Sequence, residues 1–362
     1  MSAAQEAASE VLATWGERVR QAAADGTALR IVGGGTKDFY GQDLVGERFP
    51  TGAYAGVVDY DPTELVVTAR CGTPLEEIER TLADARQMLG FEPPRFGSGS
   101  TIGGCIAAGL SGPRRPYAGA TRDHVLGVRL LDGKGEDLAF GGRVMKNVAG
   151  FDVSRLMAGS LGTLGVVLEV SLRCLPLPKK EATRILDLDG GAAVRLTNEW
   201  GARALPITAT WYADGDLFVR LSGAESAVSS AAREIGGESL ENAAAFWAAV
   251  RDQTNDFFAR AQGRALWRLS VASTAPYAEL DGAQAIEWGG ALRWLTPKDG
   301  IDAERLRAWA RQHGGHAALF RGDKSVGAFQ PLDAPTLAIH RALKSTFDPA
   351  GVFNRRRMYA DF

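Results

Sequence analysis

The sequence predicts an α+β protein made of at least two domains. Its 362 residues exceed the usual length of one domain. Twenty-seven of the 44 glycines lie in residues 1–180, whereas seven of the eight tryptophans lie between Trp200 and Trp309. In the second half, strand and helix patterns alternate, which is typical of a sheet covered by helices. We therefore predict a glycine-rich domain over residues 1–178 and a tryptophan-rich domain from residue 181, joined by a Pro- and Lys-containing linker over 175–180.

Composition excludes several classes of protein. A chain that is 45% hydrophobic and 23% charged, with mean hydropathy −0.10, is typical of a soluble globular protein. The net charge of −2 argues against nucleic-acid binding. The N-terminus is acidic and no apolar stretch is long enough to span a membrane, so we expect no signal peptide and a cytoplasmic location, with any membrane contact peripheral.

The three cysteines do not indicate a metal centre or a disulfide framework. Cys71, Cys105 and Cys174 are far apart, and no C-x-x-C pair supports zinc or iron–sulfur ligation. We interpret them as reduced, partly buried thiols. His313 and His316 lack the spacing of a zinc site on a helix, and we interpret that segment as the turn after a helix.

The expected elements of the first domain follow from local patterns. An apolar face that includes Val11, Leu12, Trp15 and Val19 predicts a helix over 6–24, and Pro74 at a first helical position predicts another over 73–88. Apolar runs bounded by turn residues predict strands. These strands cover residues 28–32, 56–60, 64–70, 125–131 and 164–175.

The second domain is predicted as a sheet with covering helices. Strands are expected over 183–188, 207–212, 217–221, 265–272, 291–295 and 316–320. Helices are expected over 192–200, 225–235, 240–261 and 303–313, and a last helix over 333–347 ends before Pro349. We expect Trp211, Trp247 and Trp309 to fill the core, although some tryptophans could serve a partner interface.

Familiar nucleotide and hydrolase motifs are absent. The Rossmann pattern G-x-G-x-x-G fails because Asp38 takes the third glycine position after Gly33 and Gly35. No lysine has the setting of a Walker A loop. In place of G-x-S-x-G, the nearest match over residues 99–103 has Thr101 at the nucleophile position.

Three loops of small residues remain, over 33–37, 97–112 and 159–167. Consecutive backbone N–H groups in a glycine loop can converge on an anion. The hydroxyls of Ser100, Thr101 and Ser111 can serve phosphate or sugar oxygens. We expect the three loops to enclose a large, flat, partly anionic ligand, a description that a nucleotide with a pyrophosphate satisfies best. Gly133 and Gly135, in contrast, are interpreted as a hairpin turn.

Longer motifs carry a family resemblance over nearly the whole chain. They occupy residues 60–66, 92–94, 111–116, 141–156, 266–270, 288–295, 347–354 and 358–360. With the spacing of the loops, they resemble the FAD-binding superfamily of vanillyl-alcohol oxidase and p-cresol methylhydroxylase (PCMH), and within it the family of FAD-binding E subunits of bacterial glycolate oxidase. The resemblance implies a two-lobed PCMH-type FAD-binding domain over 1–178, a smaller α+β cap, substrate or subunit-interface domain over 181–330, and a C-terminal helix and tail over 331–362 that pack back on the FAD domain.

The same resemblance implies which residues contact FAD. They are Gly33, Gly34, Gly35, Thr36 and Lys37 at the pyrophosphate, then Pro93, Ser100, Thr101, Gly103, Gly104, Ala108, Gly109, Ser111, Gly112, Gly159, Gly165, Val166 and Val167, and Asn354 from the tail. Many superfamily members tether the flavin through a histidine. Because His124, the one histidine of the first domain, lies outside these loops, we expect non-covalent FAD and no metal.

The function implied is that of an FAD-dependent subunit of a multi-subunit glycolate oxidase or dehydrogenase. Such a complex oxidises glycolate, or another small 2-hydroxy acid such as D-lactate, to the 2-oxo acid. Electrons would pass to a larger flavoprotein subunit and an iron–sulfur subunit. Two alternatives stay open: a structural or assembly subunit with a catalytically silent flavin, and a stand-alone flavin oxidase.

Substrate residues are the least defined part of the sequence. Oxidation of a 2-hydroxy acid needs a cation for the carboxylate and a base for the hydroxyl proton. Arg268 and Arg293 are candidates for the cation because each lies in an apolar strand next to a tryptophan, where an arginine needs an anionic partner. A salt bridge to a neighbouring acid is the alternative for both. The sequence offers no convincing base, and the catalytic residues stay unassigned.

Overall fold

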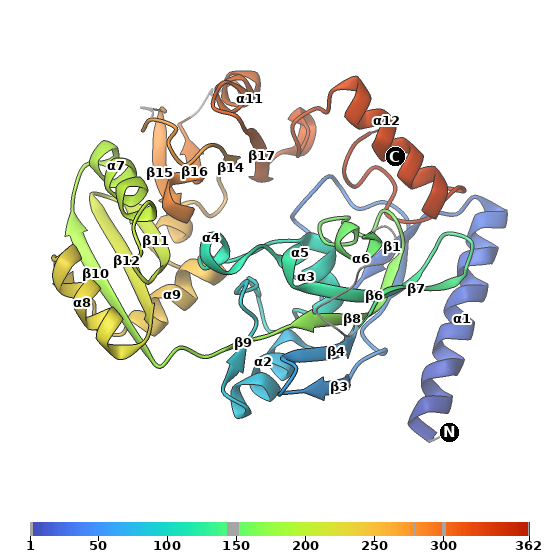
Figure 1. The fold of residues 1–362 in the computed structure, drawn as a ribbon. Helices are drawn as coiled ribbons and strands as arrows, with labels where there is room; N and C mark the ends of the chain where they lie inside the picture. The colour runs from blue at the N-terminus through green and yellow to red at the C-terminus, as the bar shows by residue number, and fades with distance from the viewer. Residues whose placement is uncertain (1–2, 143–151, 278–279, 299–301, 361) are drawn as a thin grey trace.

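A computed structural model describes residues 3–142, 152–277, 280–298, 302–360 and 362 (Figure 1). Most of the glycine-containing motif over 141–156 therefore lies outside the described residues. The fold has two main sheets, which Figure 1 shows side by side with a segment of extended chain between them.

The first sheet has five antiparallel strands in the order β3-β4-β8-β6-β7. Their bounds are β3 (Val57–Asp61), β4 (Val66–Arg70), β6 (Val125–Leu131), β7 (Asp137–Gly141) and β8 (Val166–Arg173). Almost every residue of β8 is buried, as expected for a central strand covered on both faces. The hairpin of β6 and β7 turns at Gly133 and Gly135, as the sequence predicts.

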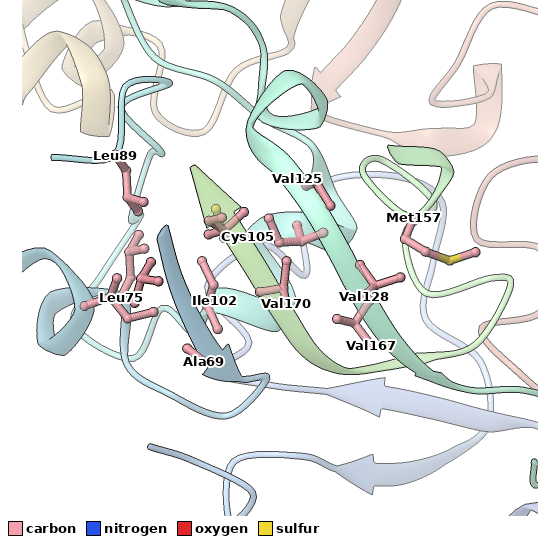
Figure 2. Close-up of a cluster of buried hydrophobic side chains, with 14 of the residues drawn as sticks. Ala69, Leu75, Leu89, Ile102, Cys105, Val125, Val128, Met157, Val167 and Val170 are labelled. Carbon is pink, nitrogen blue, oxygen red and sulfur yellow. The ribbon is translucent and has the colours of Figure 1, made fainter. Parts of the chain in front are cut away.

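Among the described residues, six helices belong to this half of the chain, and some of them close the core of the sheet. They are α1 (Ala3–Asp25), α2 (Leu75–Asp84), α3 (Ile102–Ala108), α4 (Arg115–Ala118), α5 (Thr121–His124) and α6 (Val153–Leu156). Figure 2 shows the core between α2, α3 and the sheet, where Leu75 and Ile102 are fully buried and face Val170 of β8. α1 packs separately, with Trp15 against Phe49 and Tyr54.

The C-terminal tail returns to this part of the molecule. β1 (Leu29–Val32) pairs in parallel with β2 (Glu47–Pro50), and Leu29 also forms a parallel bridge with Phe353 of the tail. α12 (Ala334–Phe347) precedes the tail, and its Phe347 joins the core of the five-stranded sheet (Figure 1).

The second sheet has eight strands in the order β13-β10-β12-β11-β15-β16-β14-β17. Their bounds are β10 (Lys180–Asp187), β11 (Ile207–Ala213), β12 (Asp216–Gly223), β13 (Glu238–Ser239), β14 (Leu266–Ser270), β15 (Gly282–Glu287), β16 (Leu292–Pro297) and β17 (His316–Arg321). Every pairing within it is antiparallel.

The helices of this half are α7 (Gly190–Gly201), α8 (Glu225–Ile235), α9 (Ala243–Asp252), α10 (Asp256–Arg260) and α11 (Ala303–Gln312), with short 3-10 turns η1 (Trp288–Gly290) and η2 (Lys324–Val326). One face of the sheet packs against the loops of the first half, because Ala108, Leu110 and Leu161 share a core cluster with Trp211 and Trp294. The sheet therefore forms one wall of whatever lies between the two halves.

Most predicted elements are present, but β2, β7 and α3 were not predicted, and other segments differ from the prediction. The helix predicted over 73–88 ends at Asp84, because Arg86 has φ 56°, and Gln87–Met88 instead form β5. The predicted linker contributes β9 (Leu175–Pro176), which pairs with β5. The helix predicted over 240–261 breaks at Gln253, which has φ 56°. β15 was not predicted from the sequence.

The two large sheets lie on either side of the predicted boundary at 178–181. The division into domains stays a prediction. His313 ends α11 and Gly314 follows with φ 71°, so the turn predicted there is confirmed. The three cysteines are free and buried. Trp211 and Trp247 are buried, and Trp309 is partly buried in the core behind α11.

Candidate functional site

A cleft lined by the glycine loops runs along the first half of the molecule. The space between its lining residues, open solvent included, is about 770 Å³. We call it the glycine cleft. Predicted FAD contacts that line it are Gly33, Gly34, Gly35, Thr36, Lys37, Thr101, Gly103, Gly104, Ala108, Gly165, Val166, Val167 and Asn354. The three loops predicted as one ligand site thus surround a single space.

Backbone donors in the first loop are free to bind an anion. The loop follows β1, and within the described residues the N–H groups of residues 33–37 have no intramolecular hydrogen-bond acceptor. Gly35 has φ 71°, which turns the chain so that successive N–H groups can converge. Orphan backbone donors are costly unless a ligand or water satisfies them. A pyrophosphate supplies the acceptor oxygens this loop lacks, so the loop fits FAD.

Lys37 adds a positive charge at the end of the same loop. Its Nζ donates to Ser100 Oγ at 2.7 Å and lies 5.7 Å from the centre of the Phe96 ring. Among the described residues it has no carboxylate within ion-pair distance, and burial lowers its pKa. A buried ammonium without a counter-ion favours an anionic ligand. Ser100 does not line the cleft itself and acts on it through Lys37.

Several glycines are required by contacts between loops. A Cβ on Gly34 would lie 1.5 Å from the carbonyl oxygen of Gly99, and one on Gly33 would lie 2.5 Å from Thr101 Oγ1. A Cβ on Gly109, which ends α3 with φ 63°, would lie 2.7 Å from the backbone nitrogen of Gly159. These glycines bring the three loops together, and the ligand space is what the loops enclose.

The C-terminal tail fixes two of the loops through Asn354. Its Oδ1 accepts from the backbone N–H of Ile31 at 2.8 Å, and its Nδ2 donates to the carbonyl of Leu161 at 2.6 Å. Asn354 therefore connects β1 to the third loop while it lines the cleft. A Cβ on Gly162 would lie 2.7 Å from Asn354 Nδ2, so this junction also needs a glycine.

A buried ion pair supports that junction. Lys344 Nζ donates to Asp348 Oδ2 at 2.6 Å, to the carbonyl of Thr163 at 2.7 Å and to that of Phe353 at 2.9 Å. Asp348 accepts in turn from the backbone N–H groups of Val352 and Phe353, each at 2.8 Å. The pair holds α12, the tail and the third loop in one arrangement.

Arg357 of the tail fixes the chain that directly follows the first loop. Its guanidinium donates to the backbone carbonyls of Asp38, Tyr40 and Gln42, and burial lowers its pKa to about 10. The sequence analysis did not single out this residue. A buried arginine among carbonyls leaves no local pattern by which to find it.

A second, smaller pocket lies where the first half meets the eight-stranded sheet. The space between its lining residues, open solvent included, is about 320 Å³. We call it the arginine pocket. Its lining residues are Pro94, Phe96, Leu110, Ser111, Gly112, Pro113, Val250, Arg251, Gln253, Arg268, Glu287, Leu292, Trp294 and Phe320. The chain that lines the glycine cleft at Ala107 and Ala108 reaches this pocket by Leu110, so one segment connects the two.

The structure separates the two arginines proposed for the substrate. Arg268 on β14 lines the arginine pocket, stacks on Trp288 at 5.1 Å, and has no ion pair or hydrogen bond among the described residues. Burial lowers its pKa, which Tyr40 and Glu287 partly offset. Arg293 instead donates to the carbonyls of Gly290 and Ala275, at 2.7 and 2.9 Å, so its guanidinium is already occupied. The salt bridge considered as the alternative is present for neither among the described residues.

A carboxyl group that sequence reasoning missed faces the same pocket. Glu287, the last residue of β15, is only 4% exposed. Its Oε1 accepts from Trp294 Nε1 at 2.6 Å. Burial raises its pKa to about 7, although the Trp294 hydrogen bond and Arg268 act in the opposite direction. No motif marks it, because its position depends on the pairing of β15, which was not predicted.

The remaining predicted contacts lie close to, but not on, the glycine cleft. Ser111 and Gly112 line the arginine pocket. Pro93 lines neither space, and Gly109 and Gly159 contact each other where α3 meets the third loop. His124 is buried, and its ring nitrogens pair with the carbonyls of Arg173 and Ala118, away from the cleft.

The described part of the chain contains no group of three or more His, Cys, Asp or Glu side chains placed to hold a metal ion. None of its helices combines the length and apolarity needed to cross a membrane.

Comparisons with known proteins agree with this geometry. Residues 12–141 match the family model described as FAD binding domain. The chain is 46% identical over 346 residues to glycolate oxidase subunit GlcE of Escherichia coli (strain K12), which covers 95% of this chain and 96% of the relative. It is 30% identical to glycolate oxidase subunit GlcD of Bacillus subtilis (strain 168) over 154 residues, 42% of this chain and 33% of the relative.

Further similarities cover a smaller part of the chain or have a lower sequence identity. The mitochondrial D-lactate dehydrogenase [cytochrome] 1 of Saccharomyces cerevisiae is 32% identical over 133 residues, 37% of this chain and 22% of that enzyme. The solved structure of an alkyldihydroxyacetonephosphate synthase superposes with a TM-score of 0.63 at 16% identity, over 94% of this chain and 74% of the other. This last likeness confirms the predicted fold class.

Proposed function

The chain belongs to the family of the glycolate oxidase subunit GlcE, an FAD-dependent oxidoreductase family, and from that premise we propose that it is the FAD-binding subunit of a multi-subunit enzyme that oxidises a small 2-hydroxy acid. Glycolate is the proposed substrate because it appears in the name of the full-length relative. The other relatives named as D-lactate dehydrogenases support the same substrate class.

The single observation that carries the proposal is the glycine cleft. Five consecutive backbone N–H groups, over residues 33–37, have no acceptor among the described residues and fit the pyrophosphate of FAD. Lys37 adds a positive charge beside them. The apolar wall formed by Leu161, Val166 and Val167 suits the uncharged parts of the cofactor. Bound FAD would accept the hydride, with its electron pair, that oxidation of an alcohol releases.

The residues of the chain supply binding and orientation. The first loop binds the pyrophosphate, and Asn354 and the Lys344–Asp348 pair keep the third loop against it. Arg268 has a guanidinium without an anionic partner in the arginine pocket, and we assign it to the substrate carboxylate. Because Arg293 is occupied by two backbone carbonyls, we do not assign it to the substrate.

The FAD is proposed to be non-covalent, because the ring nitrogens of His124 pair with backbone carbonyls away from the glycine cleft. The proposed partners are a larger flavoprotein subunit and an iron–sulfur subunit. The proposed location is cytoplasmic, with membrane contact through the complex. The absence of C-x-x-C pairs in the sequence supports electron transfer to a partner rather than to a cluster within this chain.

The test is purification of the tagged full-length chain, once alone and once from cells that also express the proposed partner subunits. We expect one FAD per chain, released as a yellow supernatant by acid precipitation, and co-purifying subunits. Anaerobic glycolate should bleach the flavin of the isolated chain. A chain purified without flavin would overturn the proposal. A bound flavin that glycolate leaves oxidised in the chain and in the complex would identify an assembly subunit instead.

A further inference from the structure

Glu287 is a buried carboxyl group that FAD binding does not use. It lies at the end of β15, where η1 begins, and lines the arginine pocket. One of its oxygens accepts from Trp294 Nε1 at 2.6 Å. The other oxygen has no hydrogen-bond partner among the described residues. A carboxyl group buried this deeply with half of its acceptor capacity unused is costly to keep unless the site has a use for it.

The strand register places Glu287 and Arg268 on the same face of the eight-stranded sheet. Glu287 of β15 pairs with Leu292 of β16, and Arg268 of β14 pairs with Trp294, two residues further along β16. Directly opposite residues of antiparallel strands share a face, and so do residues two apart on one strand. That face looks toward the first half of the molecule, because Trp294 packs in one cluster with Ala108 and Leu110.

Among the described residues, the carboxyl group of Glu287 and the guanidinium of Arg268 form no ion pair. The arginine pocket lies between the strands that carry these two residues. Arg268 stacks on Trp288, and Arg115 lies 4.4 Å from the centre of the same ring and also forms no ion pair among the described residues. The pocket therefore offers positive charge for a small carboxylate and one carboxyl oxygen for a hydroxyl group.

The charges around Glu287 suit proton transfer near neutral pH. Burial raises its pKa to about 7, while the Trp294 hydrogen bond and Arg268 lower it and the charge of Glu92 raises it. Arg251 also lines the pocket. Near pH 7 both protonation states are populated, which is the condition under which a carboxylate accepts a proton efficiently.

We infer that Glu287 is the proton acceptor for the hydroxyl group of a small 2-hydroxy acid whose carboxylate is bound by Arg268, so that this chain carries its own oxidation site. The inference rests on the proposed function. The hydroxyl O–H bond breaks and its proton goes to Glu287, which becomes a neutral acid. The C2–H bond breaks with its electron pair, the hydride goes to the FAD, and C2 and the oxygen form the carbonyl of the 2-oxo acid.

The first experiment measures binding rather than turnover. Oxalate, a small carboxylate that lacks an oxidisable C–H bond, is titrated into the full-length FAD-loaded chain at pH 7 by calorimetry, in two buffers of different ionisation enthalpy. We expect proton uptake on binding, because an anion beside Glu287 raises its pKa further. Glu287→Gln should bind oxalate without this uptake. The control Glu225→Gln, at an exposed ion pair on α8, should behave as the unmodified chain.

The second experiment measures the rate of flavin reduction by glycolate under anaerobic stopped flow. Glu287→Gln should lower the limiting rate by about 10²-fold or more, with a smaller change in the glycolate concentration for half-saturation. In the unmodified chain the rate should rise with pH through about 7, since the base form is then populated. Glu287→Asp, which keeps the carboxylate but shortens its reach, should fall between the two and retain the pH dependence.

The outcomes separate this inference from the proposed function. Equal proton uptake or equal reduction rates in Glu287→Gln and the unmodified chain would overturn the inference. An FAD-loaded chain that does not bind oxalate would overturn it too. In each of these cases the proposed binding of FAD would be unaffected. A chain without FAD would overturn the proposed function itself. The FAD absorbance and thermal midpoint of each variant show whether it is folded, and Glu287→Asp carries the test if Glu287→Gln does not fold.

Discussion

The glycine cleft and the arginine pocket present polar groups by different means. In the cleft, backbone N–H groups of residues 33–37 face the ligand space, and the surrounding glycines allow three loops to touch. In the pocket, the polar groups belong to side chains of paired strands, namely Arg268 of β14, Glu287 of β15 and Trp294 of β16. A site built from backbone groups tolerates a change in side-chain chemistry but not in side-chain size. A site built from side chains tolerates a small change in size but not the loss of the charged or polar group.

This difference predicts how each region fails when it is altered. A backbone donor survives any side-chain substitution that the loop can accommodate, so only a steric change removes it. A guanidinium or a carboxyl group is lost by a single conservative substitution that leaves the fold intact. Variants of the cleft should therefore lose stability and FAD together, and variants of the pocket should lose ligand binding or proton transfer alone.

The largest effect is expected for Gly34→Ala. The added Cβ would lie 1.5 Å from the carbonyl oxygen of Gly99, and both atoms belong to backbone that no rotamer change can move. We expect a loss of more than about 5 kcal/mol in the free energy of unfolding, in the exceptional range for one substitution, and no bound FAD. Chemical denaturation and the flavin absorbance of the purified chain measure the two losses.

Gly52→Ala is the matched control. A Cβ on Gly52 meets no atom within 4 Å, so we expect a stability within about 0.5 kcal/mol of the unmodified chain and full FAD content. If Gly34→Ala bound FAD as well as Gly52→Ala does, the contact between the first two loops would not shape the cleft.

The next effect is expected at the buried pair that supports the third loop. Lys344→Met leaves Asp348 as a buried charge without its partner and removes the donor to the carbonyls of Thr163 and Phe353. Breaking such a pair costs about 3–5 kcal/mol, and FAD affinity should fall with stability because the loop is released. Lys180→Met removes an exposed pair with Glu225 and should cost less than about 1 kcal/mol. Equal losses in the two variants would show that the buried pair has no special part in the cleft.

The cleft was predictable from sequence because its signals are local. Glycine runs at 33–35 and 103–104 and the apolar strands beside them are readable without knowledge of distant contacts. The family resemblance then placed Asn354 at the same site, far away in the chain. The glycine surplus was assigned to the ligand, whereas Gly33, Gly34 and Gly109 are also needed where loops meet each other.

The arginine pocket was not predictable in the same way. Glu287 is the last residue of a strand that no clear alternation marked, and its role depends on the register between β15, β16 and β14. Arg268 and Arg293 have the same sequence signature, an arginine beside a tryptophan in an apolar strand, yet only Arg268 lines the pocket. Register and long-range pairing separate them, and neither is encoded in a short window of sequence.

The two arginines provide a test of that distinction. Arg268→Met should weaken oxalate binding to the FAD-loaded chain by roughly 10- to 100-fold, the worth of a charge-assisted hydrogen bond, with little change in the thermal midpoint. Arg293→Met should lower the thermal midpoint and leave oxalate binding nearly unchanged. It removes the donor to the carbonyls of Gly290 and Ala275, and each unpaired carbonyl costs about 1–3 kcal/mol. Calorimetry and thermal denaturation of both variants provide the comparison. Reversed outcomes would exchange the assigned roles of the two residues.

The smallest effect is expected at Trp294. Trp294→Phe keeps an aromatic ring in the pocket but removes the N–H that donates to Glu287 Oε1, and that hydrogen bond lowers the pKa of Glu287. Its loss should move the midpoint of the pH–rate profile for flavin reduction upward from about 7, by less than about one pH unit. The sign follows because the carboxylate, not the neutral acid, loses a hydrogen-bond donor. Trp200→Phe, on α7 in a separate core cluster, serves as the control, and its midpoint should not move. An unchanged or lowered midpoint in Trp294→Phe would mean that the titrating group seen in the rate is not Glu287.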